Sequence, residues 1–160
     1  MRKVSLLIVA SLTAVLIATV GLRAQSQESL FGTWKMNLAK SKYSPGPAPK
    51  SSSSKYEAFE GGVKLTVDTV PVQGETQHWE VSGKFDGKDN PVKGNNPDGD
   101  TVAFSKTDAR TYELVQKKGG KTTVNAHIVV AADGKTRIVT QTGKNGQGQT
   151  INHSQFYEKQ

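Results

Sequence analysis

Glycine turns divide most of this chain into short segments in which polar and apolar residues alternate. Five dipeptides typical of tight turns follow one another along the chain: Gly61-Gly62, Asp86-Gly87, Gly119-Gly120, Asp133-Gly134 and Asn145-Gly146. Such dipeptides supply the positive φ angles that two-residue hairpin turns require, so strands that are neighbours in the sequence should pair. The pattern predicts an antiparallel meander. A sheet closed on itself buries one face of many strands without long free edges, which favours an all-β fold, a single up-and-down barrel.

The alternation predicts eight to ten strands. In residues 63–68, for example, valine and leucine alternate with lysine, threonine and aspartate. The predicted strands are 31–38, 55–59, 63–70, 75–85, 101–106, 110–117, 121–131, 135–142 and 149–159, with a weaker piece around Pro91-Val92. Residues 39–54 are rich in serine, lysine and proline and have neither strand nor helix periodicity. We expect them to form a long loop that covers the mouth of the barrel.

The first residues have the pattern of an export signal. Arg2 and Lys3 precede an uncharged stretch, and a polar run follows Ala24. Cleavage after Ala24 removes residues 1–24 and leaves residues 25–160, the size of one domain with one core. The uncharged stretch has 19 residues, close to the roughly 20 that span a bilayer, so an uncleaved anchor is the alternative. We expect an exported protein, periplasmic or secreted, without a membrane span after processing.

Charge and cysteine content exclude some classes of protein. The chain has no cysteine, so it has neither disulfide bonds nor the lipid-bearing cysteine of bacterial lipoproteins. Loss of the three basic residues before position 25 lowers the formal net charge from +7 to +4, because 18 basic and 14 acidic residues remain. These basic residues are scattered and are not interleaved with aromatic residues, so no nucleic-acid partner is predicted. We expect a monomer.

Two short motifs lie at the ends of the predicted barrel. Phe-Gly-Thr-Trp-Lys at 31–35 opens the first strand, and Phe-Tyr-Glu-Lys at 156–159 closes the last. Together they resemble the lipocalin and fatty-acid-binding-protein superfamily, the calycins, whose Gly-x-Trp signature corresponds here to Gly32-Thr33-Trp34. The chain looks most like small exported lipocalin-like domains of bacteria. The resemblance implies that Gly32 and Trp34 form the barrel floor, with the tryptophan ring packed across one end.

The last predicted strand departs from the family pattern. In fatty-acid-binding proteins it carries Arg-x-Tyr, whose side chains point inward and hold a ligand carboxylate. The matching residues here are Gln155-Phe156-Tyr157, so the tyrosine is kept and the cation is replaced by an amide. A neutral amide binds a buried carboxylate less well than a guanidinium does. The expected ligand is therefore small and mainly apolar.

The same strand provides the predicted ligand-binding residues. If Gln155 and Tyr157 face inward, a period of two places Ile151 and His153 on the same face. His153, Gln155 and Tyr157 would then fix the orientation of a ligand in an otherwise apolar pocket. Two alternatives remain: these side chains bond to one another or to trapped water, or the register shifts by one residue and Phe156 points inward.

No other group of residues indicates chemistry. The three histidines lie on three different predicted strands without the spacing of a metal site: His78, His127 and His153. Three polar residues surround Asp98-Gly99 but lack the distant glutamate of a calcium loop, so a plain turn is expected: Asn96, Asp98 and Asp100. We find neither a nucleophile with its base nor paired carboxylates, and predict no enzyme, metal or cofactor.

The sequence therefore predicts an exported lipocalin-like protein that holds a small, mainly apolar ligand inside its barrel. The alternative is a barrel with a filled interior that binds a protein or a glycan of the cell envelope through its outer surface.

Overall fold

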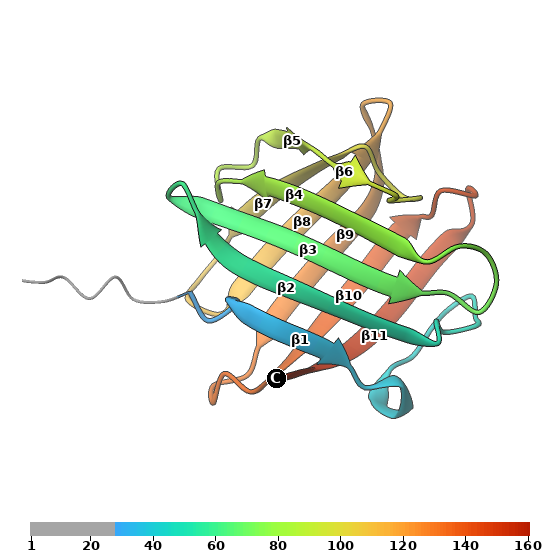
Figure 1. The fold of residues 1–160 in the computed structure, drawn as a ribbon, viewed down its shortest axis with the longest axis horizontal. Helices are drawn as coiled ribbons and strands as arrows, with labels where there is room; N and C mark the ends of the chain where they lie inside the picture. The colour runs from blue at the N-terminus through green and yellow to red at the C-terminus, as the bar shows by residue number, and fades with distance from the viewer. Residues whose placement is uncertain (1–27) are drawn as a thin grey trace, which may run out of the picture.

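Eleven antiparallel strands form one sheet that curls into a nearly closed barrel in the computed structural model, which describes residues 28–160 (Figure 1). The strands are β1 (Gly32–Met36), β2 (Ser51–Phe59), β3 (Gly62–Val70), β4 (Gln77–Gly83), β5 (Asp89–Pro91), β6 (Lys93–Gly94), β7 (Thr101–Lys106), β8 (Thr111–Lys118), β9 (Lys121–Val130), β10 (Thr136–Lys144) and β11 (Thr150–Lys159). A single short 3₁₀ helix within this range, η1, covers Leu38–Lys40. The predicted all-β barrel is confirmed, and the strand count exceeds the predicted range through the very short β5 and β6.

The predicted export signal, residues 1–24, lies outside the described residues. In the part of the chain that the structure describes, no helix is long and apolar enough to cross a membrane.

The order of strands in the sheet is β5-β7-β8-β9-β10-β11-β1-β2-β3-β4-β6. Pairing of β1 with β11 joins the first and last strands of the described residues (Figure 1). The sheet ends at β5 and β6, which follow one another along the seam between β4 and β7 (Figure 1): β5 pairs with β7 and β6 pairs with β4. The Val92 N–H donates to the Asp100 carbonyl at 2.9 Å, and the Asn95 N–H donates to the His78 carbonyl at 2.8 Å. These bonds hold the short strands over the seam, so the barrel is nearly closed.

The hairpin turns follow the prediction in part. Gly119-Gly120, with φ angles of 57° and 74°, forms the predicted two-residue turn between β8 and β9. The turn between β2 and β3 lies one residue earlier than predicted, at Glu60-Gly61, because Phe59 pairs with Gly62 in the ladder. Asp86-Gly87 joins β4 to β5, which are not paired strands, and the last two predicted turns lie within longer loops.

The predicted loop 39–54 is shorter than expected, because β2 begins at Ser51. The run Ser51–Ser54 is therefore part of the sheet and not of the predicted loop. Residues 42–44 also add to the sheet: the Ser154 N–H donates to the Lys42 carbonyl at 2.9 Å, and the Asn152 N–H donates to the Ser44 carbonyl at 2.7 Å. This segment continues the edge of β11 beyond the end of β1.

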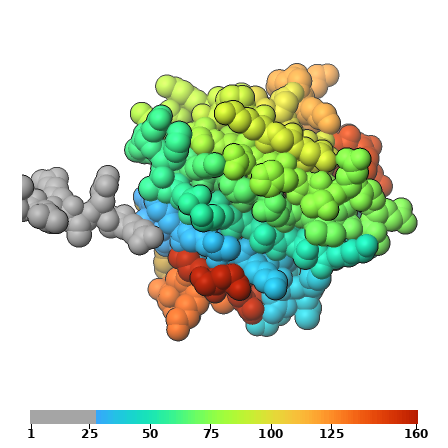
Figure 2. Space-filling model, in the orientation of Figure 1, coloured from blue at the N-terminus to red at the C-terminus, as the bar shows by residue number. Residues whose placement is uncertain are grey.

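Inside the barrel, the two ends are packed differently. We call the end near Gly32 and the start of β10 the floor half, and the end near Met36 and the start of β11 the mouth half. Buried apolar side chains pack against one another in the floor half, and none of them lines the cavity of the mouth half: Leu30, Trp34, Val63, Val81, Val102, Phe104, Tyr112 and Val130. Over β1 to β4, the outer wall is continuous on the face shown in Figure 2.

Candidate functional site

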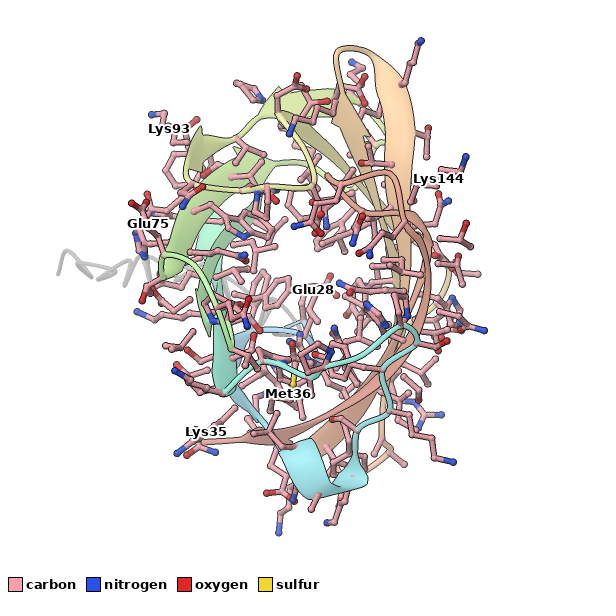
Figure 3. The ribbon with its side chains drawn as sticks, turned by 90° about the vertical axis from the view of Figure 1, so that its right-hand side faces the viewer. Glu28, Lys35, Met36, Glu75, Lys93 and Lys144 are labelled. Carbon is pink, nitrogen blue, oxygen red and sulfur yellow. The ribbon has the colours of Figure 1, made fainter. Side chains whose placement is uncertain are left out.

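A cavity of about 470 Å³ occupies the mouth half of the barrel. Figure 3 looks into the ring of strands that surrounds it, with Met36 pointing into the interior. Its volume falls within the roughly 300–1,000 Å³ of small-molecule sites. The apolar part of its wall includes side chains from β1, β2, β3, β4, β8, β9, β10 and β11: Met36, Tyr56, Leu65, Val67, Trp79, Leu114, Ala126, Ile128, Val139 and Tyr157. Pro47, Pro49, Pro71 and Val72 line its outer end.

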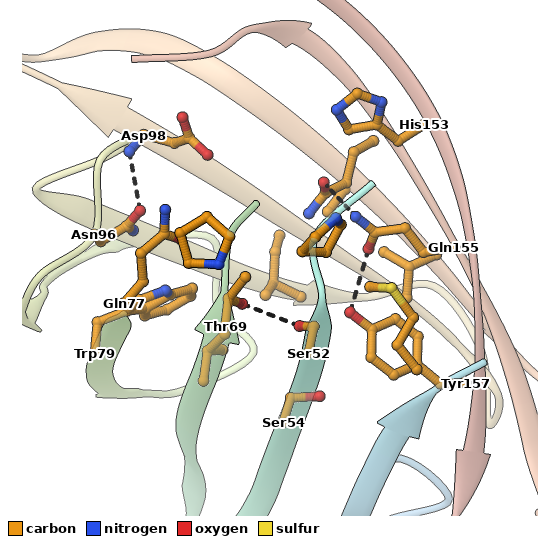
Figure 4. Close-up of a pocket in the computed structure, with 18 of the residues that line it drawn as sticks. Ser52, Ser54, Thr69, Gln77, Trp79, Asn96, Asp98, His153, Gln155 and Tyr157 are labelled. Carbon is orange, nitrogen blue, oxygen red and sulfur yellow. Dashed lines mark hydrogen bonds between the residues drawn. The ribbon is translucent and has the colours of Figure 1, made fainter. Parts of the chain in front are cut away.

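The three predicted ligand-binding residues of β11 all line this cavity (Figure 4). Gln155 and Tyr157 are buried, His153 is half-buried, and Phe156 has the opposite orientation, so the strand has the predicted inward register. Their role in ligand binding stays a prediction. Burial raises the pKa of the Tyr157 phenol, so this hydroxyl is present as a neutral donor and acceptor.

These polar groups are bonded to one another. The Gln155 amide donates to Gln141 Oε1 on β10 at 2.9 Å, and the Tyr157 hydroxyl donates to Gln155 Oε1 at 3.4 Å (Figure 4). His153 Nδ1 accepts the Ser44 N–H at 3.2 Å, and its ring lies 4.5 Å from that of Tyr43. Burial lowers the pKa of His153, which favours the neutral ring that this acceptor role requires. The side chains on this wall are thereby held in fixed positions.

A second polar group of the cavity wall lies on β2 and β3 and was not predicted. Ser52 and Ser54 point inward from β2, and Ser52 Oγ bonds to Thr69 Oγ1 on β3 at 3.0 Å (Figure 4). Four consecutive serines look alike on both faces of a strand, so the sequence held no sign of which ones face inward. Only β1 separates β2 from β11 in the sheet, so these hydroxyls extend the polar part of the wall that begins on β11.

The polar turn around Asp98 closes part of the outer end. Asn96 Nδ2 donates to Gln116 Oε1 at 2.9 Å, and Asn96 Oδ1 accepts the Asp98 N–H at 3.0 Å. The Asp98 carboxylate accepts the Gly146 N–H at 2.8 Å, which ties this turn to the one between β10 and β11. Asn96 and Asp98 line the cavity (Figure 4), so the predicted turn also forms part of its rim.

Arg137 on β10 is the main residue of the site that the sequence did not reveal. Only 2% of its surface is exposed, and it lines the deep end of the cavity. Its neighbour Ile138 is 47% exposed on the outer face. Arginine is usually exposed and isoleucine is usually buried. Alternation along β10 would therefore favour Ile138 inside the barrel and Arg137 on its outer face. The cation absent from position 155 is therefore present inside the barrel, on the strand next to Tyr157, with which Arg137 pairs.

Gly32 and Trp34 lie in the floor half, at the end of the barrel away from the cavity mouth. Trp34 is fully buried, and its Nε1–H donates to the Leu30 carbonyl at 2.8 Å. Gly32 has a φ of 126°, which other residues rarely adopt, and a side chain there would meet Lys159. The Lys159 ammonium lies 5.0 Å from the Trp34 ring.

The start of the described chain also seals the floor. Glu28 Oε2 accepts from Lys106 Nζ at 2.6 Å and from the Tyr112 hydroxyl at 2.8 Å. These bonds favour the charged carboxylate, and the pKa of Glu28 is lowered although burial alone would raise it. Residues just before β1 are thus fastened to the turn between β7 and β8.

The other two histidines lie on the outer face, away from the cavity. His78 Nδ1 is 2.6 Å from an Asp68 carboxylate oxygen on the neighbouring strand, and His127 pairs with Glu113 in the same way. Both pairs are largely exposed.

Comparisons of this chain with protein-family models, with curated proteins and with solved structures find no match. The antiparallel, nearly closed barrel is compatible with a calycin-like fold.

Proposed function

We propose that this chain is an exported, lipocalin-like protein that binds one small, mainly apolar molecule in the mouth half of its barrel. The observation that carries the proposal is the cavity of about 470 Å³, whose wall combines apolar side chains with polar groups that are bonded to one another. Removal of ligand surface from water would drive binding, at roughly 25 cal/mol for each Å² of apolar surface. His153, Gln155 and Tyr157 would orient the ligand from one side.

Family membership is part of this proposal. Its support is the motif Gly32-Thr33-Trp34, which opens β1 and contains a fully buried tryptophan in the floor half. The short floor motif and the barrel architecture both favour a lipocalin-like protein. Export is likewise proposed from residues 1–24 alone, and a mature chain that begins at Gln25 is the result expected from intact-mass measurement of the exported protein.

The alternative, a surface-binding barrel with a filled interior, receives less support. The floor half has the packing that this alternative requires, but the mouth half does not. The cavity therefore favours ligand binding over surface binding.

Native mass spectrometry of the protein taken from its own exported fraction tests the proposal. We expect a bound small molecule at a ratio of one to one. Ile128→Phe, which places a larger side chain against the cavity, should remove it. A wild-type protein without any bound molecule, and without affinity for apolar fluorescent probes, would contradict the proposal and favour the surface-binding alternative.

A further inference from the structure

Arg137 is a buried cation without a counter-ion among the described residues. Its Nη2 donates to Ser54 Oγ at 2.5 Å, whereas Nε and Nη1 are buried and have no hydrogen-bond partner. No carboxylate of residues 28–160 forms an ion pair with it. A charge removed from water is strongly destabilising unless it is paired and hydrogen-bonded. The guanidinium therefore lacks partners that a structural role alone would require.

Aromatic rings compensate the charge only in part. The guanidinium carbon lies 4.5 Å from the Tyr157 ring centre, 4.8 Å from Trp34 and 4.9 Å from Tyr56. Ring faces attract a cation, but the N–H groups of arginine lie in the guanidinium plane and need acceptors there. These rings hold the side chain in place at the deep end of the cavity without satisfying its donors.

The surroundings add more positive charge. Lys159 Nζ lies over the Trp34 ring at 5.0 Å, and its pKa is lowered first by burial and then by the charge of Arg137. Two cations thus flank one tryptophan at the inner end of the barrel. An anion that enters the cavity would face a positive field there, in surroundings where screening by solvent is weak.

We infer that the natural ligand is an organic acid with an apolar body, bound with its acidic group toward Arg137. The inference rests on the proposed function, since it specifies the ligand class of the same cavity. The acidic group would approach from the cavity, where Arg137 forms part of the wall, and a small turn of the guanidinium would offer it the unpaired N–H groups. The apolar body would extend past Leu65, Ile128 and Val139 toward the prolines at the mouth.

Two fluorescent probes that differ by one acidic group test this inference. Anilinonaphthalenesulfonate and N-phenylnaphthylamine have the same aromatic body, and only the first carries a sulfonate. We expect wild-type protein to bind the sulfonate more tightly. Arg137→Gln should weaken sulfonate binding by about 10- to 100-fold, the effect of one lost hydrogen bond to a charged group. Affinity for the neutral probe should change less than about threefold.

Arg110→Gln is the matched control, because it removes the same charge from an exposed turn. It should leave both affinities unchanged. Ile128→Phe should reduce binding of both probes, which separates binding in the cavity from binding at the surface. If Arg137→Gln does not fold, displacement of N-phenylnaphthylamine from wild type by lauric acid and by lauryl alcohol gives the same comparison, and the acid should act at the lower concentration.

Each result decides between the claims. Equal affinity of wild type for both probes, or an equal loss of both in Arg137→Gln, would overturn the acidic-ligand inference and leave the proposed function standing. Failure of wild type to bind either probe would overturn the proposed function, and the inference with it.

Discussion

The floor half and the mouth half of this barrel are built from the same strands but have different interiors. On β9, Val130 packs against the filled core, and two residues away Ile128 lines the cavity. Along β2 and β11, the inward residues change from tyrosine near the floor to serine, glutamine and histidine near the mouth. Apolar packing, which stabilises the fold, is therefore separated along the barrel axis from the polar groups around the cavity, which suit ligand binding.

The two tryptophans give the largest expected effect and the sharpest contrast. Trp34 lies in the filled floor half, whereas Trp79 lines the cavity. Trp34→Ala should lower the free energy of unfolding by roughly 3–5 kcal/mol, the range for removal of a buried large aromatic side chain. Trp79→Ala should cost at least about 1 kcal/mol less, because one side of its ring already lacks tight packing. Urea unfolding measures both.

If Trp34→Ala costs less than about 1 kcal/mol, the floor is not a packed core. Equal losses for the two variants would remove the distinction between the halves.

A second pair of variants adds volume in place of removing it. Val130→Phe introduces a larger side chain into the filled floor and should destabilise by roughly 1–3 kcal/mol, as overpacking does. Ile128→Phe directs the added volume toward the cavity, so it should change stability by less than about 1 kcal/mol and weaken binding of apolar probes. Unfolding curves and probe titrations on the same samples check both parts, and a reversed order of stability would contradict the assignment of the cavity.

The sequence was sufficient for the barrel because the signals for it are local. Glycine turns and alternation in segments such as 63–68 specify strands that pair with their sequence neighbours. The inward register of β11 was predicted from Gln155 and Tyr157 in the same way, and the structure has this register. Pairing of β1 with β11, which joins residues far apart in the chain, followed only from the need to remove free edges.

The rest of the site depended on information that alternation does not contain. Arg137 and Ile138 occupy opposite faces of β10, and the choice of face is made by the aromatic rings of Trp34, Tyr56 and Tyr157 on other strands. Ser52 and Ser54 were missed because four consecutive serines have no visible period. The polar groups of a cavity are thus set by tertiary neighbours, which the sequence of one strand does not display.

The smallest expected effect concerns pH and the mouth half alone. Burial lowers the pKa of His153 below its ordinary value of 6.5, while the facing Asp98 carboxylate acts in the opposite direction and the Tyr43 ring covers one side. The unfolded chain then binds the proton more readily than the folded one. The contribution of neutral His153 to the free energy of unfolding is therefore complete above about pH 6.5. It is lost as the pH falls from there through the lowered pKa of His153 in the folded state.

Protonation would also remove the acceptor at Nδ1 that holds the Ser44 N–H. We expect the protection factor of the Ser44 amide, its intrinsic exchange rate at each pH divided by the observed rate, to fall between pH 7 and pH 5 in wild type, and to be low at both pH values in His153→Leu. His78→Gln, a change on the outer face, should respond to pH as wild type does. A protection factor at Ser44 that stays equally high throughout this range in wild type would show that the His153 contact does not hold the segment.

The separation of packing and binding is tested most directly by an NMR titration of the labelled protein with N-phenylnaphthylamine. The account predicts that amide shifts change in the mouth half, at residues such as Leu114, Val139 and Gln155, while those of Val63, Phe104 and Val130 in the floor half stay in place. Changes confined to the outer face, or spread equally over both halves, would contradict it.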